Sequence, residues 1–100
     1  MGRTTDAPSR ATELAARASR LRLRRGRRRA ALVAMRQACM LDDDNAAFWA
    51  RLGSLLVELG QREDAERALR RALWLRERRS DEPRARVLRL MIEELRSGAD

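Results

Sequence analysis

The sequence contains no histidine, no lysine and no tyrosine, and its only cysteine is Cys39. Zinc and other transition metals are bound mainly by histidine and cysteine, so the chain offers no ligand set for such a site. A single cysteine cannot form an intramolecular disulfide, and Cys39 lies within an apolar stretch, where a small buried side chain is expected. We therefore expect no metal, no cofactor and no catalytic residue, and hence a protein that is not an enzyme.

Long apolar runs are also missing, since the longest covers only residues 30–35. A membrane-spanning helix needs about 20 apolar residues. The first ten residues also lack the apolar segment of a secretory signal peptide. From these absences and the lone cysteine we expect a cytoplasmic protein without a membrane span.

Positive charge is abundant, and it comes entirely from arginine. The chain has 23 basic residues against 15 acidic ones, which gives a net charge of +8. This arginine content, together with 17 alanines, is typical of a GC-rich, bacterial genome, so part of the excess is compositional. The resulting field still attracts acidic peptides or nucleic acid.

Eight arginines fall within residues 17–29, and this run has three interpretations. It forms a solvated face, it meets an acidic protein partner, or it binds the phosphates of a nucleic acid. The chain has only three aromatic side chains on which bases could stack, which disfavours the last interpretation. The candidate anion-binding residues are Arg24, Arg25, Arg27, Arg28 and Arg29.

An internal repeat organises the rest of the chain. When residues 12–45 are compared with residues 46–79, ten positions are identical, among them Gly26 with Gly60 and Ala31 with Ala65. Apolar residues recur at spacings of three and four on both sides of each glycine, which predicts two helices joined by a glycine turn. We expect Gly53, Ala65 and other small residues to let the two helices of a unit approach closely.

A fifth helix is predicted after Ser80 and Asp81, because these side chains can cap its N-terminus and Pro83 fits its first turn. Asn45 or the preceding aspartate similarly caps the helix of the second unit, which makes residues 42–44 a turn rather than a calcium site. The fold class is therefore all-α, with about five helices. The apolar stripe of the last helix is Val87, Leu88, Met91, Ile92 and Leu95.

The residues of the second unit resemble the tetratricopeptide repeat. Trp49, Leu52, Gly53 and Gly60, followed by ELGQREDAERALRRAL over residues 58–73, stand at the spacings of this family. Residues 12–45 resemble a degenerate repeat, residues 46–79 a well-matched one, and residues 80–97 a capping helix. Residues 1–11 are expected to form a disordered tail, with Pro8 as a helix breaker.

The resemblance implies a solenoid of antiparallel helix pairs that acts as an adaptor or chaperone. The first helices of the pairs line a concave groove for a protein partner, and the charge favours an acidic or amphipathic segment. An arginine-rich nucleic-acid-binding protein that uses residues 17–29 is the alternative. The groove positions carried over from the family are Arg20, Leu23, Arg24, Ala47, Ala50, Ser54, Val57, Glu58, Arg84 and Leu88.

Two features concern the open end of the predicted solenoid. Trp74 lies between Leu73 and Leu75, and we expect it to pack on the final helix, with an exposed contact as the alternative. Stacked repeats normally need about three units to cover a continuous core. Because the chain has about two and a half, a homodimer is also expected.

Overall fold

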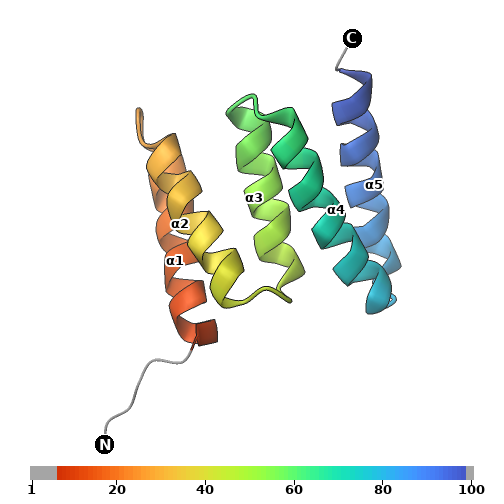
Figure 1. Cartoon of the computed structure of the whole chain (residues 1–100), viewed down its shortest axis with the longest axis horizontal. Helices are drawn as coiled ribbons and strands as arrows, with labels where there is room; N and C mark the ends of the chain where they lie inside the picture. Colours follow the sequence, from red (N-terminus) through yellow and green to blue (C-terminus); the bar gives the residue numbers. More distant parts are fainter. Residues whose placement is uncertain (1–6, 99–100) are drawn as a thin grey trace, which may run out of the picture.

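The computed structural model describes residues 7–98, and all regular structure within that range is helical. The helices are α1 (Ala7–Arg22), α2 (Arg28–Leu41), α3 (Ala46–Glu58), α4 (Arg62–Arg78) and α5 (Glu82–Ser97). Helices α1 and α2 form one antiparallel pair, α3 and α4 form a second, and α5 packs on α4 (Figure 1). The predicted all-α solenoid of five helices is confirmed.

Three of the turns between helices place a residue in the left-handed conformation. Gly26 has φ of 76° and Gly60 has φ of 75°. Glycine adopts a positive φ at little cost, and the chain that follows then closes the helix end: the Gln61 amide donates to the Leu56 carbonyl at 2.9 Å. Ser80 takes the same conformation after α4, with φ of 56°. The sequence marked only two of these three turns with glycine.

Side-chain caps begin two of the helices, as predicted. Asn45 Oδ1 accepts a hydrogen bond from the Phe48 amide at 3.2 Å, and Asp81 Oδ1 accepts one from the Arg84 amide at 3.4 Å. Asp42 accepts a hydrogen bond from the Asn45 side-chain amide at 3.1 Å. The acidic segment 42–44 therefore forms a turn and helps to orient the cap of α3.

Close approach within each helix pair depends on small residues. Three alanines of α1, Ala11, Ala15 and Ala18, are buried. In the second pair, a Cβ added at Gly53 lies only 2.6 Å from Leu69 Cδ2 and 3.4 Å from the Ala65 carbonyl oxygen. The expected small-residue contact between α3 and α4 is therefore present in the structure.

The first helix begins earlier than predicted. Residues 7–11, assigned to the disordered tail, form the first turn and a half of α1, and Ala11 at the end of this segment is fully buried. Pro8 does not break the helix, because it lies in the first turn, where the missing N–H needs no partner. Residues 1–6 of the predicted tail lie outside the described residues.

Two apolar side chains expected in the core lie at the surface. Trp74 is 45% exposed and stacks between the guanidinium groups of Arg71 and Arg78, 5.0 and 4.7 Å from its ring centroid. The alternative of an exposed Trp74 therefore holds, because its neighbours Leu73 and Leu75 occupy the inward directions of α4. Val87 is 55% exposed, since α5 turns Leu88 inward instead.

Candidate functional site

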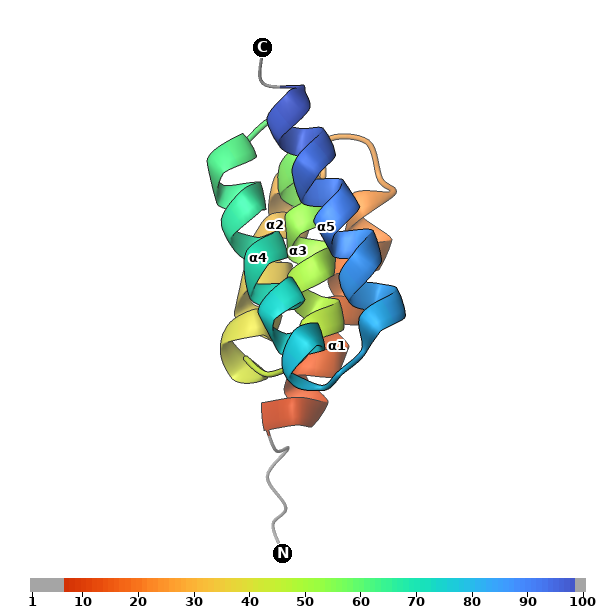
Figure 2. The same ribbon diagram turned by 90° about the vertical axis from the view of Figure 1, so that its right-hand side faces the viewer.

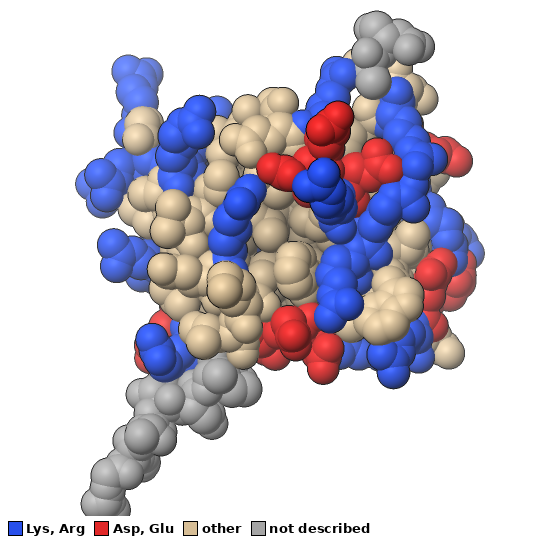
Figure 3. Space-filling model, in the orientation of Figure 1, with Lys and Arg blue, Asp and Glu red and all other residues tan. Residues whose placement is uncertain are grey.

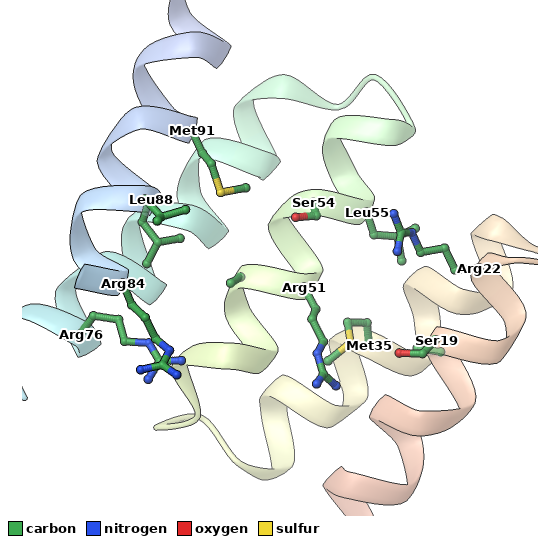
Figure 4. A pocket seen from close by; sticks show the side chains of 13 residues that line it. Ser19, Arg22, Met35, Arg51, Ser54, Leu55, Arg76, Arg84, Leu88 and Met91 are labelled. Carbon is green, nitrogen blue, oxygen red and sulfur yellow. The ribbon is translucent and has the colours of Figure 1, made fainter. Parts of the chain in front are cut away.

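A groove crosses the face formed by the first helices of the pairs. It is a hollow of about 420 Å³ between α1, α3 and α5 (Figure 4). The surface is mixed, with apolar side chains on its floor and arginines around it. Its lining residues are Ala18, Ser19, Arg22, Met35, Ala50, Arg51, Ser54, Leu55, Arg76, Arg84, Val87, Leu88 and Met91.

The depth of the groove comes from small side chains on α3. Ala50 and Ser54 are four residues apart, so they lie on one face of the helix, and neither fills the space between α1 and α5. Met35 and Leu55 form the floor towards α1, and Leu88 with Met91 forms the wall on α5 (Figure 4). An apolar side chain of a partner would lose its contact with water there.

Four arginines surround this floor, and they differ in how their charge is balanced. The guanidinium groups of Arg76 and Arg84 point to one corner and share Asp81 Oδ2, at 3.3 and 3.2 Å (Figure 4). Arg51 stands over the Phe48 ring, 5.8 Å from the centroid, and forms no ion pair with any residue from 7 to 98. This corner and Arg51 therefore present positive charge to the groove.

The fourth arginine, Arg22, closes the other end. Its Nε donates to both oxygens of Glu58, at 2.9 and 3.1 Å, and this ion pair joins α1 to the end of α3. The hydrogen bond from Arg22 holds the pKa of the Glu58 carboxyl below its usual range. The two charges largely cancel, so they fix the position of α1 rather than add positive charge.

The groove continues along α3 beyond this ion pair. A second hollow of about 550 Å³ shares Arg22, Ser54 and Met91 with the first and extends past Val57 to Glu58. Together the two hollows follow α3 from Ala50 to its C-terminal end.

The predicted groove positions on α3 and α5 lie together, whereas those of the first unit do not. The structure places Ala50, Ser54, Arg84 and Leu88 in the first hollow and Val57 and Glu58 in the second. Four other predicted residues lie elsewhere. Arg20 faces α2, Leu23 and Arg24 lie in the turn after α1, and Ala47 lines neither hollow.

The length of α1 explains the places of Leu23 and Arg24, two of these four residues. This helix ends at Arg22, so the turn of residues 23–27 replaces the last helical positions that the repeat pattern implied. The side of α1 that meets the groove carries Ala18, Ser19 and Arg22. The groove residues Ser19, Arg22, Arg51 and Arg76 were not predicted from the sequence. For α1 a signal was present, because its stripe of alanines marks the buried side of the helix, next to which Ser19 and Arg22 lie.

The predicted anion-binding arginines occupy the α1–α2 turn and the start of α2. Arg28 approaches Glu58 at 4.0 Å, but Arg24, Arg25, Arg27 and Arg29 form no ion pair within the described part of the chain. Figure 3 shows basic side chains without acidic neighbours at this end of the α1–α2 pair. Most arginines of α4 and α5 differ, because an acidic side chain lies within reach.

The structure places the only cysteine of the chain and the acidic side chains of the described residues. Cys39 is buried, and burial together with the nearby charge of Asp42 raises the pKa of its thiol to about 12. Among residues 7–98 no cluster of acidic or cysteine side chains has the arrangement of a metal site. Over the same range no helix is long and apolar enough to cross a membrane.

Comparison with known families agrees with this geometry. A tetratricopeptide repeat model matches residues 22–90, which cover α2, α3, α4 and the first part of α5. Curated proteins and solved structures gave no significant match. The chain belongs to the tetratricopeptide repeat family, whose repeats generally mediate protein–protein interaction.

Proposed function

We propose that this protein is a non-enzymatic, cytoplasmic adaptor or chaperone that binds an acidic, amphipathic protein segment in the groove between α1, α3 and α5. The observation that carries this proposal is the combination of an apolar floor with a positively charged rim in one hollow. Family membership supplies the class of partner, a protein, and the residues of the groove supply its chemistry.

The floor favours a segment with apolar side chains on one side. Leu55, Leu88 and Met91 offer no polar group to a ligand, and Ala50 leaves room above α3. Burial of apolar surface contributes about 25 cal/mol per Å², so one or two leucine-sized side chains would supply part of the binding free energy of a weak, reversible complex.

The rim favours carboxylates on the flanks of the same segment. Arg51 forms no ion pair with the rest of residues 7–98, and Arg76 and Arg84 share one aspartate between them. Arginine pairs with carboxylates in a bidentate geometry, which fixes the register of a bound segment. A basic segment would meet like charge at the same positions.

A peptide titration tests the proposal. The probe is a fluorescent amphipathic peptide with leucines on one face and glutamates on the other, compared with a peptide in which lysines replace the glutamates. We expect saturable binding of the acidic peptide alone, weakened at least about tenfold by Arg51→Glu. Arg25→Glu makes the same change of net charge outside the groove and serves as the matched control. An equal loss of peptide affinity in both variants would contradict the proposal, because the binding would then depend on net charge and not on the groove.

The unpaired arginines of the α1–α2 turn support a second candidate function, the binding of nucleic acid. Because Arg24, Arg25, Arg27 and Arg29 have no acidic partner within the described residues, they remain available to phosphates. Binding of this kind weakens steeply with salt, by roughly one power of salt concentration for each phosphate contact. Replacing Arg24, Arg25, Arg27 and Arg29 by glutamine should abolish retention of single-stranded RNA and leave the acidic peptide bound.

A further inference from the structure

Helix α5 is the last of the helices within residues 7–98, and its outer face has no helical neighbour in that range. Figure 2, in which α5 faces the viewer, shows this side of the helix uncovered. In the two helix pairs, α1 is covered by α2 and α3 by α4. Helix α5 packs on α4, and among the described residues no further helix follows to cover its other side. On the uncovered side, Val87 and Leu90 are 55% and 59% exposed.

The position of Leu90 defines the centre of this face. The buried residues of α5 are Ala85, Leu88 and Ile92, and at about 100° per residue Leu90 points in the opposite direction. Leu90 therefore contributes nothing to the core of one chain. A surface leucine alone needs no explanation, but here it is accompanied by Val87 one turn earlier.

The charges around Leu90 separate into paired and unpaired groups. Arg89 lies 3.0 Å from Glu77 and Arg96 lies 2.9 Å from Glu66, so the edge of α5 next to α4 is neutralised within the chain. On the outer face, neither Arg86 nor Glu93 forms an ion pair with any other residue in the range 7–98.

Arg86 and Glu93 are seven residues apart and lie on the same flank of the outer face, with Leu90 between them. In an antiparallel pair of α5 helices with its two-fold axis at Leu90, each Arg86 lies beside the partner's Glu93. The mismatch along the axis is one residue, or about 1.5 Å. A parallel two-fold pair would instead place this flank of the two helices on opposite sides of the interface, so Arg86 could not reach the partner's Glu93.

We propose that two copies of this protein associate through the outer faces of their α5 helices, antiparallel, with Leu90 at the centre and Arg86 paired to the partner's Glu93. This face adjoins the groove, and Val87 lies at the boundary between the two, because it also lines the first hollow. The contact is self-complementary, as a two-fold interface requires, and the symmetry makes each ion pair twice. Because only Val87 and Leu90 contribute large apolar side chains, the dimer is weak and its population depends on protein concentration.

Charge reversal tests this geometry without removing apolar contacts. Sedimentation equilibrium of the full chain, from micromolar to millimolar concentration, is expected to show a monomer–dimer equilibrium. Arg86→Glu alone, or Glu93→Arg alone, should raise the dissociation constant at least about tenfold, because two attractions become repulsions. An equimolar mixture of these two variants should form a heterodimer, since every charge across its interface is again matched.

Arg25→Glu changes the net charge equally, far from α5, and is expected to leave the dimer unchanged. Circular dichroism of each variant shows that the fold is retained. A parent protein that stays monomeric throughout the range overturns the proposal. So does a dimer that both single reversals leave intact, because another surface must then hold it, such as a groove occupied by a second copy.

Discussion

The contact between Gly53 and Leu69 allows a prediction in which two opposing effects can be weighed. Replacing glycine by alanine inside a helix usually stabilises a protein, by about 0.5–1 kcal/mol. At Gly53, however, the added Cβ lies 2.6 Å from Leu69 Cδ2 and 2.7 Å from its Cγ, which is closer than non-bonded carbon atoms normally approach. Leu69 is fully buried, so it has little freedom to move away.

The magnitudes decide the sign of the effect. Overpacking of a filled core costs about 1–3 kcal/mol, which exceeds the gain in helix propensity. We therefore expect Gly53→Ala to lower the free energy of unfolding by about 0.5–2 kcal/mol. For a domain of this size that corresponds to a fall in melting temperature of roughly 4–8 °C per kcal/mol. Urea unfolding followed by circular dichroism and tryptophan fluorescence measures the change.

A double-mutant cycle isolates the cause. Leu69→Ala alone should cost about 2–5 kcal/mol, because it leaves a cavity in the core. In that background the atoms that oppose the new Cβ are gone, so Gly53→Ala should become stabilising by about 0.5–1 kcal/mol. Sucrose keeps both variants folded enough to compare, if needed. A Gly53→Ala variant that is more stable than the parent protein would refute the close approach of α3 and α4.

Three further predictions follow from single contacts. Burial raises the pKa of the Cys39 thiol to about 12, so iodoacetamide at neutral pH should alkylate it only after unfolding; rapid labelling of the native protein contradicts its burial. Asn45→Ala should lower the free energy of unfolding by about 1 kcal/mol in urea, because the cap of α3 is lost. Gln61 begins α4 without a side-chain cap bond, so Gln61→Ala should change the same quantity by only about a few tenths of a kcal/mol. Glu58 has its pKa lowered by Arg22, so this pair contributes stability above about pH 4.3, at most about 1 kcal/mol, and loses it as pH falls through the folded-state pKa. When the free energy of unfolding is measured against pH, Glu58→Gln should lack this loss of stability at low pH. A pH profile that matches that of the parent protein would show that the pair contributes nothing.

The second repeat could be predicted from the sequence because its local signals agree. Gly53 and Gly60 occur where a helix contact and a turn require glycine, and apolar residues follow the helical period on both sides. The first unit carries weaker signals. Its start was predicted too late, since alanines at the beginning of α1 have no pattern that distinguishes a helix end from a tail.

The groove was predictable on α3 and much of α5, but not on α1. Family positions can be carried over only while two helices have the same length, and α1 ends at Arg22. Of the four arginines that border the groove, Arg84 was predicted, whereas Arg22, Arg51 and Arg76 were not. Arg76 belongs to α4, a second helix of its pair, and reaches the groove because its long side chain extends around to Asp81.

The sequence by itself determined the helical class, the turns at Gly26 and Gly60, a side-chain cap at Asp44 or Asn45 and the positive net charge, because each depends on neighbouring residues or on composition alone. Only the tertiary structure decided which arginines are neutralised and which face the groove. An ion pair such as Arg22 with Glu58 joins residues 36 positions apart, so its formation depends on how the helices stack. The same stacking left Leu90 on the outside of α5, where no partner within the described chain covers it.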